Sequence, residues 1–167
     1  MTDMPADSTR GDDAGLAPAV YAAVAARRAQ FDNLLWQVPA VSLTAQAFLF
    51  TIALDSGSRR LARAVACLLS LVATFLTVQI LTRHRQAEIT DAHWLAEFES
   101  ANGLSPQAHG PDWRRRRNAT PADAWVFSPL ARLPGFKTWA LGLSIFGVAA
   151  LVILIITVAA PQLLEAR

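Results

Sequence analysis

The stretch from residue 59 to residue 101 constrains the fold more than any other part of the chain. It contains neither glycine nor proline, so nothing breaks a helix before Asn102 and Gly103, which are typical of a helix C-terminus. As one α-helix it would be about 65 Å long at ~1.5 Å per residue. Residues 64–81 carry no charge, whereas residues 82–101 are as charged as the surface of a soluble helix. Because a bilayer core is only about 30 Å thick, the sequence predicts a helix that crosses a membrane and continues into water as a stalk.

The apolar residues of the chain gather in three blocks. The 167 residues are 53% hydrophobic and 17% charged, with a mean hydropathy of +0.31, and soluble domains rarely combine such values. The blocks cover residues 38–54, 64–81 and 138–160, and none of them contains a charged side chain. A transmembrane helix needs about 20 apolar residues. The sequence therefore predicts an all-α membrane protein with three transmembrane helices.

The first two spans are predicted to belong to one long antiparallel helical hairpin at residues 18–101. Pro18 is expected in the first turn of its first helix, and residues 55–58 (Asp-Ser-Gly-Ser) are typical of a tight turn between the helices. Residues 1–17, rich in Asp, Ala, Gly and Pro, are predicted to be a disordered acidic tail.

The remaining segments lie after the hairpin. Residues 102–137 contain five prolines and a run of arginines, and are predicted to form a juxtamembrane loop with one short helix from Thr120 to Phe127. Residues 161–167 follow the third span as a C-terminal tail.

A turn centred on residue 57 predicts the register of the hairpin. Residues that face one another should have numbers that sum to about 114, which places Tyr21 near His93 and Trp94. The same register brings opposite charges together in the stalk: Arg27 and Arg28 with Glu88 and Asp91, and Asp32 with Arg83 and Arg85. Exposed ion pairs contribute only about 0–1 kcal/mol each. These pairs therefore indicate how the helices align rather than how stable they are.

Gln46 is the most polar side chain near the middle of a span. Its amide needs hydrogen-bond partners in hydrocarbon, and the register places it near Cys67 and Ser70. Hydrogen bonds between transmembrane helices contribute roughly 0.6–2 kcal/mol, so Gln46 and Ser70 are candidates for an intramembrane polar contact. Two interpretations stay open: the amide holds the hairpin together, or it lines a pore or an oligomer contact.

Trp113 precedes an unbroken run of four arginines, Arg114, Arg115, Arg116 and Arg117. Basic residues next to a membrane are attracted to anionic lipid by about 1 kcal/mol each. Nucleic-acid binding is the competing interpretation, but it needs a fold that presents the run to a groove. We therefore predict contact with membrane lipids and no nucleic-acid partner.

The sequence carries no recognisable catalytic, cofactor-binding or metal-binding constellation. His84 and Glu88 are four residues apart, as are His93 and Glu97, but a metal site needs three or four converging ligands. Such spacing is far more typical of solvated pairs on a helix surface. No phosphate-binding loop and no nucleophile motif is present, so we expect neither enzymatic activity nor a cofactor.

The distribution of basic residues predicts the orientation in the membrane. Eleven Lys and Arg residues lie in the N-terminal segment and the loop between the second and third spans, and four lie on the other side. Lys and Arg accumulate on the cytoplasmic side. We predict a multi-pass protein of the cell membrane with its N-terminus in the cytoplasm and its C-terminus outside.

The layout of residues 19–101, a helix, a membrane hairpin and a returning helix, resembles the two-transmembrane SLATT-type domains of bacterial conflict systems. The resemblance covers about half of the chain and lies in residue character at 21–36, 38–54 and 64–94, while the third span departs from it. It implies an oligomeric membrane effector or channel-like protein. The alternative is a non-conducting anchor or scaffold whose cytoplasmic hairpin binds a partner protein.

Overall fold

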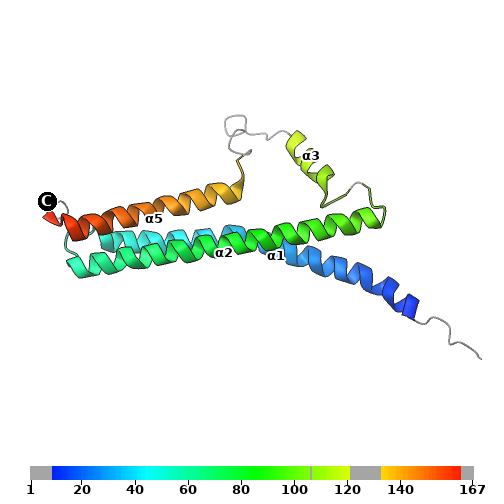
Figure 1. Ribbon diagram of the computed structural model, residues 1–167, viewed down its shortest axis with the longest axis horizontal. Coiled ribbons are helices and arrows are strands. Elements are labelled where there is room, and N and C mark those ends of the chain that lie inside the picture. Colours follow the sequence, from blue (N-terminus) through cyan, green and yellow to red (C-terminus); the bar gives the residue numbers. More distant parts are fainter. Residues whose placement is uncertain (1–8, 106, 121–132, 163–167) are drawn as a thin grey trace, which may run out of the picture. The chain divides into compact units, whose positions relative to one another are not determined.

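A computed structural model describes residues 9–105, 107–120 and 133–162, with backbone only for residues 9–16 (Figure 1). These residues form the α-helices α1 (Thr9–Leu54), α2 (Arg60–Ala101), α3 (Pro111–Ala119) and α5 (Gly135–Ala159), and the described ranges contain no strand. The helices α1, α2 and α5 are long and apolar enough to cross a membrane. The protein is therefore an all-α membrane protein with a long helical hairpin and a third apolar helix, as predicted.

The chain divides into two compact units. The stalk unit combines Met1–Phe31 with Ala87–Pro121, and the membrane unit combines Asp32–Gln86 with Ala122–Arg167. All three predicted spans belong to the membrane unit. Most of the predicted stalk of the hairpin, together with α3, belongs to the stalk unit, but Asp32, Arg83 and Arg85 belong to the membrane unit.

The first helix begins earlier than predicted. Helix α1 starts at Thr9, so residues 9–17 are helical rather than a disordered tail, while residues 1–8 lie outside the described residues. Pro18 costs the helix one backbone hydrogen bond, yet α1 continues past it.

Two apolar clusters hold the three helices of the membrane unit together, and each draws residues from all three. Leu35, Leu81 and Leu143 form the buried centre of one, and Ala53, Ala66 and Cys67 form that of the other, against Ile153 and Leu154. Helix α5 accordingly lies alongside the apolar parts of α1 and α2 (Figure 1). It coincides closely with the third span predicted at residues 138–160.

Two arginines near the start of α2 bind the ends of the other helices. The Nε of Arg60 donates to the carbonyl of Thr157 (2.8 Å) and its Nη2 donates to that of Val158, in the last turn of α5. Buried Arg63 donates to the carbonyl of Asp55, just after α1 ends. Helix C-termini carry unsatisfied carbonyls and partial negative charge, so both cations are favourable there.

Helix α2 ends as the sequence predicted. Gly103 takes a left-handed conformation with φ 65°. The Gly103 amide donates to the carbonyl of Ser100 and the Leu104 amide donates to that of Glu99, which is the pattern of a Schellman motif. This turn sends the following segment back towards the last turns of α2.

The segment predicted as a loop at residues 102–137 contains a helix. Helix α3 carries Trp113 and the whole arginine run, so the prediction of a loop was wrong at these positions. Pro111 occupies the first turn, where its missing amide proton costs nothing, and Asp112 suits the positive helix end. The short helix predicted from Thr120 to Phe127 lies, beyond residue 120, outside the described residues.

Candidate functional site

Two ion pairs join the stalk helices as the register predicted. Arg27 forms a bidentate pair with Asp91, its Nε 2.9 Å and its Nη2 2.6 Å from the two carboxylate oxygens. Arg28 donates to one oxygen of Glu88 from Nε (3.1 Å) and Nη2 (3.0 Å). Both carboxylates are buried. Among the described residues, no ion pair joins Asp32 to Arg83 or Arg85, so this third contact is not seen.

The observed register differs from the predicted one by a few residues. Tyr21 packs on Phe98, with ring centroids 5.2 Å apart, and bonds to Glu99, so its predicted position near His93 and Trp94 was wrong. Partner numbers sum to 116 for Arg28 and Glu88 and to 118 for Arg27 and Asp91, instead of 114. Helical side chains tilt towards the N-terminus of their own helix. In an antiparallel pair, each of the two contacting residues therefore lies about one position C-terminal to the point at which their side chains meet. Their residue numbers then sum to about two more than the position of the turn predicts.

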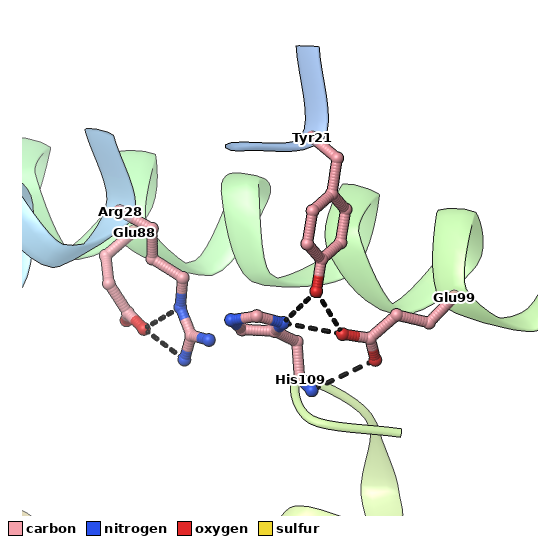
Figure 2. A network of polar contacts seen from close by, with 5 residues as sticks. All are labelled: Tyr21, Arg28, Glu88, Glu99 and His109. Atoms are coloured by element: carbon pink, nitrogen blue, oxygen red, sulfur yellow. Dashed lines mark hydrogen bonds and ion pairs between the residues drawn. The ribbon is translucent and has the colours of Figure 1, made fainter. Parts of the chain in front are cut away.

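Glu99 is buried and forms the centre of a partly buried polar network in the stalk unit (Figure 2). Its carboxylate accepts hydrogen bonds from the Tyr21 hydroxyl (2.7 Å), the His109 backbone amide (3.1 Å) and His109 Nδ1 (2.7 Å). Burial opposes ionisation of Glu99, but the hydrogen bonds from His109 and Tyr21 prevail and hold the pKa of Glu99 below its ordinary value. The network therefore ties the segment after α2 to both stalk helices.

Sequence reasoning missed Glu99 and His109. One signal was available: a carboxylate in the last turn of a helix opposes the helix dipole, so Glu99 needs compensating donors. Nothing in the local sequence indicates that His109, ten residues further on, supplies two of them.

An open pocket of about 540 Å³ lies beside this network. It is lined by Arg28, Gln107, Ala108, His109, Trp113 and Arg116. Trp113 and Arg116 are three residues apart on α3 and so share a helix face. Arg114, Arg115 and Arg117 are exposed and do not line the pocket, so the helix divides the run of four arginines that the sequence presented as one feature.

In the membrane unit, the side-chain amide of Gln46 is fully buried, and each of its hydrogen-bonding groups has a partner. Its Nε2 donates to the Ser70 carbonyl (3.0 Å) and to the Thr74 hydroxyl (2.7 Å), and its oxygen accepts a hydrogen bond from the Ser70 hydroxyl. Gln46 and Ser70 therefore meet as the register predicted. Gly147 of α5 packs directly on Thr74: a Cβ at residue 147 would lie 2.9 Å from Thr74 Cγ2.

The described residues contain no group of three or more His, Cys, Asp or Glu side chains that could hold a metal ion. Comparisons with protein-family models, with curated proteins and with solved structures found no match to this chain. The functional argument therefore rests on the geometry of the two units.

Proposed function

We propose that this protein is a non-conducting membrane anchor whose stalk binds a partner outside the bilayer. The observation that supports this most directly is the state of Gln46. Both N–H groups and the oxygen of its amide bond within the same chain, and none of the side chain is exposed. A side chain enclosed between helices of one chain is suited to holding those helices together, and is not available to line a path for ions between chains.

A substitution at Gln46 tests the proposal. We expect no ion flux from liposomes that contain either the wild type or Gln46→Leu, under every trigger tested. The variant should also unfold in detergent within about 1.5 kcal/mol of the wild type, because leucine removes the amide together with its desolvation cost. The measurement is flux at equal inserted protein, with the mass of each detergent complex as the control. Wild-type flux that falls in Gln46→Leu would contradict the anchor and favour a pore.

An oligomeric effector is the second candidate, and the outer face of α1 is the observation that favours it. Four small, exposed residues recur at helical spacing on this face: Ala40, Thr44, Ala47 and Thr51. Small residues allow transmembrane helices to approach closely, and the resemblance to SLATT-type domains points the same way. The mass measurement decides this candidate: a complex of several chains that conducts ions supports it, whereas a monomer removes it.

The orientation that we propose places the stalk unit in the cytoplasm. It follows from the eleven Lys and Arg residues on that side against four on the other. The structure gives two of those four, Arg60 and Arg63, a separate role as donors to helix C-termini. These two arginines near the turn therefore have a structural role that does not depend on the orientation of the protein in the membrane.

Thiol labelling in intact cells tests this orientation. A cysteine introduced at Ser56 should react with a membrane-impermeant reagent, and one at Ser105 should react only after the cells are opened. Both positions are exposed, while the native Cys67 is buried and gives a low background. Labelling at Ser105 and protection at Ser56 would invert the orientation.

A further inference from the structure

We propose that the pocket beside Glu99 binds a small phosphate-bearing anion through the guanidinium groups of Arg28 and Arg116. This inference goes beyond the anchor function and does not depend on it. Three of the six residues that line the pocket are basic types, one is an amide, and none is a carboxylic acid. The chain as a whole has a net charge of only +2. Basic side chains are therefore concentrated at this pocket, although Glu88 pairs with Arg28 and Glu99 pairs with His109 behind it.

Buried carboxylates orient two of the basic groups from behind. Glu88 binds the Nε and Nη2 of Arg28, and Glu99 binds the Nδ1 of His109. In Figure 2 the guanidinium of Arg28 and the imidazole of His109 lie between these two carboxylates, with the Nε2 side of His109 turned towards Arg28. Donors held in place before a ligand arrives lose less entropy on binding. This arrangement is that of a prepared site rather than of freely moving surface cations.

Helix α3 supplies the third basic group and an aromatic face. Arg116 and Trp113 lie one turn apart and both line the pocket. Guanidinium groups match phosphate oxygens with paired hydrogen bonds, and an indole ring can contact the remainder of a ligand. The pocket, of about 540 Å³, is open to solvent. A free phosphate compound and a phospholipid headgroup share this chemistry, so the experiment must separate them.

The test measures binding to the full-length protein in neutral detergent at pH 7, in phosphate-free buffer with 150 mM salt. Calorimetric titrations use inorganic pyrophosphate, short-chain phosphatidylglycerol and short-chain phosphatidylcholine as separate probes. The variant is Arg116→Gln. Its matched control is Arg114→Gln, which removes the same charge from the same helix but lies outside the pocket. Both arginines are exposed, so neither change should unfold the protein, and circular dichroism checks this.

We expect saturable binding of pyrophosphate or of phosphatidylglycerol, weakened about ten- to a hundredfold by Arg116→Gln and less than about threefold by Arg114→Gln. Binding of pyrophosphate identifies a free phosphate ligand, and binding of phosphatidylglycerol alone identifies a headgroup. An equal loss of affinity in the two variants would show that α3 attracts anions only through its overall positive charge. That result would overturn the proposal. Saturation by none of the probes, or equal binding of phosphatidylcholine, would do so as well. Ion flux from the wild type would overturn the anchor function and leave this proposal intact.

Discussion

Replacing Glu99 with alanine should detach the segment after α2 from the stalk helices and lower the free energy of unfolding of the stalk unit by about 2–4 kcal/mol. The carboxylate accepts three hydrogen bonds, two of them from His109. Without it, the partly buried His109 amide loses its acceptor, and the Tyr21 hydroxyl keeps only its longer contact with His109 Nδ1 (3.3 Å). Hydrogen exchange should show faster exchange at the His109 amide in the variant, and thermal unfolding should give the loss of stability.

Glu97→Ala is the matched control for Glu99→Ala. Both residues lie in the last turns of α2, but Glu97 is exposed. Because either substitution removes a negative charge from the helix C-terminus, a dipole effect would appear equally in the two variants. A loss of stability confined to Glu99→Ala assigns the effect to the network. Equal behaviour of the variants, or unchanged exchange at His109, would refute its structural role.

The same network makes the stability of the stalk unit depend on pH. Folding lowers the pKa of Glu99 below its ordinary value of 4.5, so its contribution is present above that value and is lost as the pH falls towards the folded-state pKa. The difference in melting temperature between the wild type and Glu99→Gln should therefore be larger at pH 7 than at pH 4. A difference that stays constant across this range would show that ionisation of Glu99 does not stabilise the fold.

Gly147→Ala should loosen the contact of α5 with α2 and destabilise the membrane unit by about 1–3 kcal/mol. The new methyl group would lie 2.9 Å from Thr74 Cγ2, closer than carbon atoms can approach. Thr74 is not free to rotate, because its hydroxyl accepts the hydrogen bond from Gln46 at 2.7 Å. The strain therefore falls on the packing of the helices. Thermal unfolding in detergent gives the size of the effect.

Two further variants make the Gly147 experiment specific. Gly142→Ala is the control on the same helix, because no atom lies within 4 Å of its new Cβ, and it should not destabilise the protein. Thr74→Ser removes the methyl group that clashes with a Cβ at residue 147 but keeps the hydroxyl. The double variant Thr74→Ser with Gly147→Ala should therefore recover most of the stability that Gly147→Ala loses. Failure of this rescue would mean that α5 does not pack on Thr74.

The amino-acid sequence by itself determined the features that depend on local signals. The stretch without glycine or proline predicted α2, and Asn102 and Gly103 predicted its end, because helix propagation and termination depend on neighbouring residues. Length and lack of charge predicted the third span. The central position of the turn predicted two of the charged pairs in the stalk, and the tilt of helical side chains accounts for about two residues of the error in register.

Only the tertiary structure decided which distant groups meet. No local rule links His109 to Glu99, because the contact depends on the path of the chain after the Schellman turn. The binding of Arg60 to the end of α5 and the packing of Gly147 on Thr74 likewise join segments far apart in sequence. The run of four arginines was visible in the sequence, but only helix α3 and the residues around it determine that Arg116 faces the pocket while its neighbours do not. Side-chain direction on a helix changes by about 100° per residue, so adjacent identical residues acquire different surroundings.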